Sequence, residues 1–131
     1  MARPRPRQPM PDQHPFLDEP DRFFMEWIPE QLAAHPAYRA QVGRDHAIAQ
    51  IELAGERGGT WHVTMGDGDV AVARGPHAAP SFTIAMAVDT FRKLREGRIG
   101  VPGALLRGKI KARGSLGTLL KVGRNLKHEG S

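Results

Sequence analysis

The chain has 131 residues, of which 40% are hydrophobic and only 6% aromatic, so it fits one small domain and is too short for two. It contains no cysteine, which excludes a disulfide framework and a zinc site built from thiolates. The net charge is +5, but residues 91–131 hold eleven Lys and Arg against two acidic residues and so carry +9.

Residues 1–20 hold six of the 11 prolines, with Arg-Pro repeats and few large apolar side chains. This composition predicts a disordered or extended tail, and a single domain over residues 21–131. No apolar run reaches the ~20 residues that a membrane span needs. The basic start is not followed by the apolar stretch of a signal peptide, so we expect a cytoplasmic protein.

A first helix is predicted to begin at Asp21, which can serve as its N-cap, and to end at His35-Pro36. Pro29 is expected to kink or restart this helix. Four large apolar residues fall on one side of it, and we interpret that side as core packing. They are Phe23, Phe24, Trp27 and Ile28.

Three segments then alternate apolar and polar residues, the pattern of strands with one buried face. Residues 46–54 form the first, although Ile48 breaks the alternation and suggests partial cover on both faces. The second and third form a hairpin. Trp61, Val63 and Met65 lie on one face of the strand before an Asp67-Gly68 turn, and Val70 and Val72 lie on the strand after it.

The C-terminal third combines helices and one more strand. After a strand with Phe82, Ile84 and Met86 on one face, a helix is expected from an Asp89 cap to a Gly97 stop. A short apolar turn containing Pro102 follows. Residues 109–113 alternate again. Ser115 is a predicted N-cap for a last helix whose apolar stripe is Leu116, Leu119, Leu120 and Gly123.

These elements predict an α+β fold, with a mostly antiparallel sheet of about five strands and helices packed on one face. The sequence from Gly103 to Lys109 satisfies G-x-x-x-x-G-K, but Ile110 stands where a phosphate-binding loop needs Ser or Thr, and a strand follows. The six histidines show no metal-ligand spacing and no nucleophile elbow is present, so no catalytic residue, metal or cofactor is expected.

The segment ALLRGKIKARGSL (104–116) resembles the end of the sterol carrier protein 2 (SCP-2) domain, where a small apolar turn, Gly-Lys, an alternating strand, Gly and a closing helix follow one another. The hairpin WHVTMGDGDVAVARG (61–75) and residues 80–97 are similar to the family's preceding elements. The resemblance covers roughly residues 55–122. It implies an apolar tunnel between sheet and helices, closed by the last helix.

On this resemblance, a lipid would contact apolar side chains of the C-terminal half. The expected lipid-binding residues are Phe82, Ile84, Met86, Phe91, Leu94, Leu105, Leu106, Ile110, Leu116, Leu119 and Leu120. Basic residues nearby would contact a head group or an anionic membrane. They are Arg107, Lys109, Lys111, Arg113, Lys121 and Arg124.

The function that follows is a non-enzymatic intracellular lipid carrier, whose ligand is a fatty acid, acyl-CoA, phospholipid, sterol or isoprenoid. Its partners would be that apolar molecule and, transiently, an anionic membrane surface; the oligomeric state is left open. One alternative is a nucleic-acid binder, although no Phe, Tyr or Trp follows Phe91 to stack on bases. The other is a scaffold that recruits a partner enzyme through the proline-rich arm and the aromatic helix.

Overall fold

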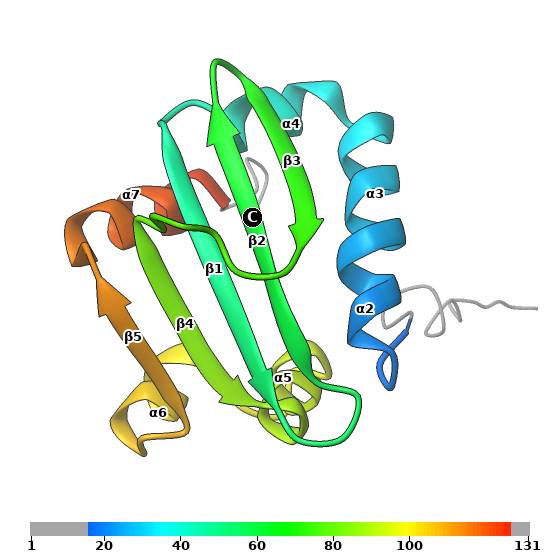
Figure 1. The fold of residues 1–131 in the computed structure, drawn as a ribbon, viewed down its shortest axis with the longest axis vertical. Helices are drawn as coiled ribbons and strands as arrows, with labels where there is room; N and C mark the ends of the chain where they lie inside the picture. Colours follow the sequence, from blue (N-terminus) through cyan, green and yellow to red (C-terminus); the bar gives the residue numbers. More distant parts are fainter. Residues whose placement is uncertain (1–15, 127–131) are drawn as a thin grey trace, which may run out of the picture.

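The computed structural model describes residues 16–126, which form a five-stranded sheet and a set of helices (Figure 1). The strands are β1 (Ala47–Ala54), β2 (Gly59–Gly66), β3 (Asp69–Arg74), β4 (Phe82–Ala87) and β5 (Ile110–Gly114). The helices are α2 (Pro20–Arg22), the π-helical η1 (Phe23–Trp27), α3 (Ile28–Ala34), α4 (Pro36–Val42), α5 (Val88–Arg95), α6 (Val101–Leu106) and α7 (Leu116–Leu126).

The strand order is β3-β2-β1-β4-β5, and every neighbouring pair is antiparallel except the central β1 and β4. In that parallel pair Ala49 lies beside Phe82 and Ile51 beside Ile84. The α+β class with a mostly antiparallel sheet is therefore confirmed. The parallel pair was not predicted, because it joins strands that the β2–β3 hairpin and the loop after it separate in the sequence.

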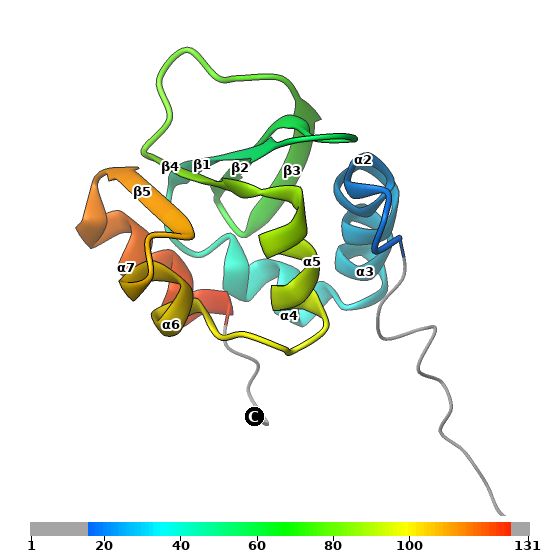
Figure 2. The same ribbon diagram turned by 90° about the horizontal axis from the view of Figure 1, so that it is seen from below.

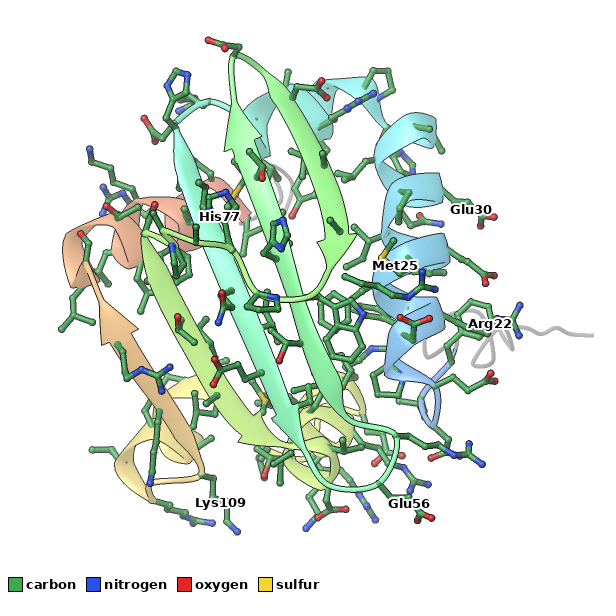
Figure 3. All side chains as sticks on the ribbon, viewed as in Figure 1. Arg22, Met25, Glu30, Glu56, His77 and Lys109 are labelled. Carbon is green, nitrogen blue, oxygen red and sulfur yellow. The ribbon has the colours of Figure 1, made fainter. Side chains whose placement is uncertain are left out.

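The helices lie on one face of the sheet, as predicted (Figure 2). α2, η1 and α3 form one continuous rod along the β3 edge, and α6 and α7 lie beneath β5 and β4. α5 lies near the ends of β1 and β2, where Phe91 packs with Leu53 and Trp61. The opposite face is crossed by the loop of residues 75–81, and His77 lies over it (Figure 3). The backbone N–H of His77 donates to the Gln50 side chain at 2.9 Å. Both faces of the sheet are therefore partly covered, one by helices and one by this loop, as the break in alternation at Ile48 suggested.

The first helix differs from the prediction at its start. It begins at Pro20, whose side chain is fully buried, and Asp21 makes no cap hydrogen bond to the backbone. Instead, Asp21 accepts hydrogen bonds from Trp61 Nε1 at 3.0 Å and from Arg74 at 2.7 Å. The carboxylate thus ties the helix to the hairpin, a long-range role that local capping rules do not detect.

The π-helical turn explains how Pro29 sits inside a continuous rod. The backbone N–H of Ile28 donates to the carbonyl of Phe23, five residues earlier, so the turn before the proline is wider than an α-helical one. Proline has no N–H and crowds the carbonyl four residues before it, and a wider turn accommodates both defects. A π-helical turn therefore takes the place of the expected kink. The helix ends at Ala34, before His35-Pro36, as predicted.

Most other local predictions hold. The turn at Asp67-Gly68 has positive φ at both residues, and Gly97 ends α5 with a φ of 77°. The Ser115 hydroxyl accepts the backbone N–H of Thr118 at 3.2 Å, so it caps α7. Asp89 does not cap α5, since Ala87 is the N-cap residue and the Asp89 carboxylate lies 3.1 Å from Lys93.

Residues 1–15 of the expected tail lie outside the described residues, as do residues 127–131. Residues 16–20, which the prediction also assigned to the tail, pack on the domain. The Arg22 guanidinium lies 4.3 Å from the centroid of the Phe16 ring, and the Asp18 carboxylate is 3.3 Å from Arg92. Within residues 16–126, no helix has the length and apolar character needed to cross a bilayer.

Candidate functional site

A cavity of about 680 Å³ lies between the sheet and the helices. The sheet contributes Ala49, Ile51, Val63, Met65, Val70, Phe82 and Ile84 to its wall. The helices, with His35 between α3 and α4, contribute Phe23, Trp27, Ile28, Gln31, Leu32, His35, Tyr38, Val42, Leu119, Val122, Gly123 and Leu126. Protein interiors are normally packed to the density of organic crystals, so an apolar space of this size is a feature that needs an explanation.

The sheet wall of the cavity includes one small residue, Ala49. It occupies an inward-facing position of β1 beside Val63 of β2 and Phe82 of β4. On the helix side, a Cβ built at Gly123 would meet no atom within 4 Å. An unfilled apolar cavity lowers stability, and a volume of roughly 300–1,000 Å³ is typical of small-molecule sites.

One wall of the cavity is α7, whose last turn is tied to α4. The Tyr38 hydroxyl donates to the carbonyl of Leu126 at 2.5 Å, and Gln41 Nε2 donates to the carbonyl of Asn125 at 2.8 Å. The Asn125 side chain in turn donates to Asp45 at 3.0 Å. These bonds satisfy carbonyls that the end of a helix leaves unpaired, and they fix which face of α7 meets the sheet.

Aromatic rings form the opposite wall. Phe23 stacks on Trp27 with centroids 5.1 Å apart and an interplanar angle of 16°, and both rings line the cavity. Phe24 lies behind them and stacks on Trp61 at 4.7 Å, outside the cavity. The helix side that the sequence assigned to core packing is therefore divided between the core and the cavity wall.

Few polar groups reach the cavity. They are the side chains of Gln31, His35 and Tyr38, all contributed by α3, α4 and the residue between them. Burial raises the pKa of the Tyr38 hydroxyl, which stays protonated and donates to Leu126. In the described part of the chain, no group of three or more His, Asp or Glu side chains could hold a metal ion. The arrangement is suited to binding an apolar molecule.

The structure brings three of the expected lipid-binding residues to the cavity: Phe82, Ile84 and Leu119. Three others, Met86, Phe91 and Ile110, are buried or partly buried away from it, and Leu94 is half-buried. Four are exposed at the surface and do not line the cavity. They are Leu105 at 43%, Leu106 at 89%, Leu116 at 58% and Leu120 at 64% of their full exposure.

The basic residues expected at a head group or membrane are all exposed, and none lines the cavity. They are Arg107, Lys109, Lys111, Arg113, Lys121 and Arg124. Lys109 lies at the start of β5 (Figure 3), and with Lys111 it borders a second hollow of about 420 Å³ near the ends of β1 and β4. Arg113 Nη2 lies 3.5 Å from the Glu52 carboxylate, so its charge is partly balanced.

Sequence reasoning missed the cavity residues of α3 and α4, and those in the last turns of α7. Trp27 and Ile28 had been noted as an apolar face, but only as core. Val122 and Leu126 follow Leu119 by three and seven residues, so the helical spacing that predicted the stripe contains them as well. The signal in α4 is weak, because residues 36–42 carry only Tyr38 and Val42 as large apolar side chains.

Comparisons with known proteins bear on this architecture. A family model described as the SCP-2 sterol transfer family matches residues 28–127. Hydroxysteroid dehydrogenase-like protein 2 of Mus musculus is 32% identical over 82 residues, which is 62% of this chain and 17% of the mouse protein. The same protein of Rattus norvegicus is 30% identical over 91 residues, which is 69% of this chain and 17% of the rat protein. The chain thus spans only a small part of these relatives.

Solved structures share the fold at lower identity. The palmitated SCP2L2 of Aedes aegypti has a TM-score of 0.59 and 21% identity, covering 79% of this chain and 95% of that one. The sterol carrier protein domain 2 of Helicoverpa armigera has a TM-score of 0.60 and 19% identity, and the match covers 82% of this chain and 89% of that one. Since the family model matches most of the sequence, the chain belongs to the SCP-2 sterol transfer family.

Proposed function

We propose that this chain is a non-enzymatic lipid-binding and lipid-transfer module that holds an aliphatic molecule in the cavity between the sheet and the helices. The single observation that carries the proposal is the apolar cavity of about 680 Å³. Burial of about ten methylene groups would contribute roughly 8 kcal/mol before the costs of association, so apolar burial is the main favourable contribution to binding. The palmitated form of the Aedes relative supports an acyl chain as one ligand. A cytoplasmic location stays a prediction.

Filling the cavity tests this proposal. The Ala49→Leu variant adds a side chain at the centre of the cavity wall, whereas Ala71→Leu adds the same atoms at an exposed position of β3. Native mass spectrometry of delipidated protein incubated with dodecanoate should show a one-to-one adduct for the parent chain and for Ala71→Leu. The adduct should be reduced or absent for Ala49→Leu. No adduct with the parent chain, or equal adducts with all three, would refute the proposal.

We further propose that the basic C-terminal segment brings the module to anionic membranes, where ligand is exchanged. Residues 97–128 contain no Asp or Glu, so every charged residue from Arg98 to Arg124 is basic. Exposed leucines lie among these charges on α6 and α7, at the two ends of β5 (Figure 1). Basic residues near an anionic bilayer contribute about 1 kcal/mol each, and exposed apolar side chains add shallow insertion.

Neither alternative function is supported by a specific observation. The basic residues carry no aromatic partner for base stacking, since the last aromatic residue of the chain is Phe91 and its ring is buried. The aromatic helix offers little surface for a partner enzyme, because Phe24 is buried and Phe23 and Trp27 face the cavity. Residues 1–15 of the proline-rich arm of the scaffold hypothesis lie outside the described residues.

A further inference from the structure

Strand β5 is an open edge of the sheet. The opposite edge, β3, has the rod of α2, η1 and α3 along it, whereas β5 is the last strand on its side (Figure 1). Within residues 16–126, no backbone group hydrogen-bonds to the outer side of β5. The register with β4 runs from Phe82–Gly114 to Met86–Ile110 without a bulge, and β5 contains no proline. The edge therefore lacks the cover, the bulge and the proline that commonly block strand edges.

The main-chain groups that point outward from β5 follow from one hydrogen bond. The Ser115 N–H donates to the carbonyl of Ser81 at 2.9 Å, on the β4 side. In a trans peptide the C=O points opposite to the N–H, so the carbonyl of Gly114 points away from β4. Because successive residues of a strand alternate in direction, Ile110, Ala112 and Gly114 present their N–H and C=O groups at the open edge. A further strand can form the ladder that β5 lacks on this side.

Three basic side chains lie along this edge, on the face of the sheet opposite the helices. Lys109, Lys111 and Arg113 are exposed and occupy every second position, while Ile110 between them is buried. Arg113 Nη2 lies 3.5 Å from the Glu52 carboxylate, but no carboxylate among residues 16–126 forms an ion pair with either lysine. Side chains directly opposite each other on paired strands are about 5 Å apart, so these charges select the strand that can pair here.

The chain's own segments are poor partners for this edge. If two copies paired their β5 strands about Ala112, Lys111 of each copy would lie opposite Arg113 of the other, and like charges directly opposite are destabilising. Residues 1–15 contain three Arg, one Asp and five Pro, so they also bring positive charge, and each proline lacks the N–H that a ladder needs. The charge of the edge is complementary to an acidic strand only.

We propose that β5 is a docking edge for an acidic, extended segment of another protein, which adds to the sheet as a sixth, antiparallel strand. Acidic residues at alternate positions of the segment lie opposite Lys111 and Arg113. The residues between them lie beside Ile110 and Ala112, on the side of α6 and α7, and are apolar (Figure 2). Main-chain hydrogen bonds supply affinity in this mode of recognition, and side chains supply specificity. No residue of β5 lines the cavity, so this surface is separate from the lipid site.

The test of charge uses the labelled peptide GEVEVEG with blocked ends, and fluorescence anisotropy with the full chain at 0.15 M salt. The peptide should bind at least about tenfold more tightly than GKVKVKG. The double variant Lys109→Glu with Lys111→Glu should lose this preference or reverse it. The same change of charge on α7, Lys121→Glu with Arg124→Glu, should leave the affinity within about twofold, because salt screens charges farther away than about 8 Å.

The test of strand addition uses the main chain. In antiparallel pairing the valine N–H groups of GEVEVEG face β5, whereas its glutamate N–H groups face away. Methylation of the two valine nitrogens should abolish binding, and methylation of the central glutamate nitrogen should leave it within about threefold. By NMR, saturating peptide should slow the amide hydrogen exchange of Ala112 and Gly114 by at least about tenfold. The N–H of Lys111 faces β4 and should change little.

Every other result overturns the inference. Equal binding of the two methylated peptides would mean that the attraction is electrostatic alone. Unchanged exchange at Ala112 would mean that the peptide binds elsewhere. Protection of Ala112 in concentrated protein without peptide would assign the edge to a second copy. If the parent chain binds neither peptide, β5 is not a docking edge, while the proposed lipid site, which the dodecanoate adduct tests, is unaffected.

Discussion

Leu119 and Leu120 are adjacent in sequence and have opposite surroundings. Leu119 lines the cavity and packs on the core residues around it, whereas Leu120 is 64% exposed. Helical geometry turns successive residues by about 100°, so two neighbouring leucines in one apolar stripe need not share a face. The difference makes them a matched pair for separating ligand contact from surface effects.

We expect Leu119→Gln to lower the affinity for dodecanoate by about tenfold or more, because it places an amide in the apolar wall. Leu120→Gln should leave the affinity within about twofold. Displacement of a fluorescent fatty acid measures both, and circular dichroism verifies that each variant is folded. Equal losses in the two variants would show that the wall assignment of α7 is wrong.

Asp21 gives a prediction on pH. Hydrogen bonds from Arg74 and then from Trp61 hold the pKa of this carboxyl below its ordinary value of about 3.8. A group with a lowered pKa in the folded state stabilises the fold above its unfolded-state pKa, and this contribution is lost as pH falls through the folded-state pKa. Asp21→Asn should therefore lower the free energy of unfolding at pH 7, by less than about 1 kcal/mol because solvent screens this partly exposed pair.

The stability difference between Asp21→Asn and the parent chain should begin to shrink as the pH falls below about 4, where the unfolded carboxyl is protonated, and should vanish once the pH falls through the lower folded-state pKa. Urea denaturation at pH 7, 5 and 3 measures it. Asp89→Asn is the control, since Asp89 is an exposed acid whose partner, Lys93, is four residues away on α5. A difference for Asp21→Asn that does not change with pH would exclude the carboxylate as the tie between helix and hairpin.

At the scale of elements, α7 combines a tied end with weak helical propensity. Its last turn is bonded to α4 through Tyr38 and Gln41, and Ser115 caps its start. Gly117 and Gly123 lie within the helix, and a Cβ at either position would meet no atom within 4 Å. Glycine inside a helix costs about 1 kcal/mol relative to alanine. The two glycines therefore favour transient opening of α7, while the Ser115 cap and the hydrogen bonds to α4 hold its two ends.

Gly117→Ala should raise the free energy of unfolding by about 0.5–1 kcal/mol and slow the release of bound dodecanoate, because α7 opens less often. Stopped-flow displacement gives the release rate. The exposed Gly103 of α6 is the control, since a Cβ there also meets no atom and α6 does not line the cavity. Gly103→Ala should raise stability without changing the rate. A release rate that Gly117→Ala leaves unchanged would show that α7 is not the moving wall.

The elements show what local sequence determines. Strand faces, the Asp67-Gly68 turn and the Ser115 cap follow from patterns of two to four residues, and all were predictable. The pairing of β1 with β4 and the bonds of Asp21 connect segments distant in sequence, so no local pattern encodes them. In α7 the leucines occupy more than one face, and the contacts with α4 select the face of Leu119, Val122 and Leu126. The set of cavity residues was therefore only partly predictable.

At the scale of the whole molecule, charge is separated from the cavity. The acid-free segment of residues 97–128 carries the basic charge, while the binding space lies on the inner side of the sheet among apolar side chains. A carrier with this layout can approach an anionic bilayer by electrostatic attraction and keep its ligand away from water. The exposed leucines of α6 and α7 lie in the same segment as the charges.

The chain should co-sediment with vesicles of phosphatidylcholine containing 30% phosphatidylglycerol, and bind vesicles of phosphatidylcholine alone much more weakly. Binding should fall steeply as salt is raised from 0.05 to about 0.5 M, because the attraction is screened. The double variant Lys121→Glu with Arg124→Glu should bind at least about tenfold more weakly, whereas Arg39→Glu on α4 should not. Equal binding to neutral and anionic vesicles would contradict the proposed role of the basic segment.

The most direct test of the account is to locate an aliphatic chain in the protein by NMR. With methyl-labelled protein and unlabelled dodecanoate, we expect nuclear Overhauser contacts from the ligand methylenes to the methyl groups of Ile51, Val63 and Leu119, which line the cavity. The exposed methyl groups of Leu106 and Leu116 should show none. Contacts confined to these exposed leucines, with no change at the cavity residues, would contradict the central claim that the lipid is held between sheet and helices.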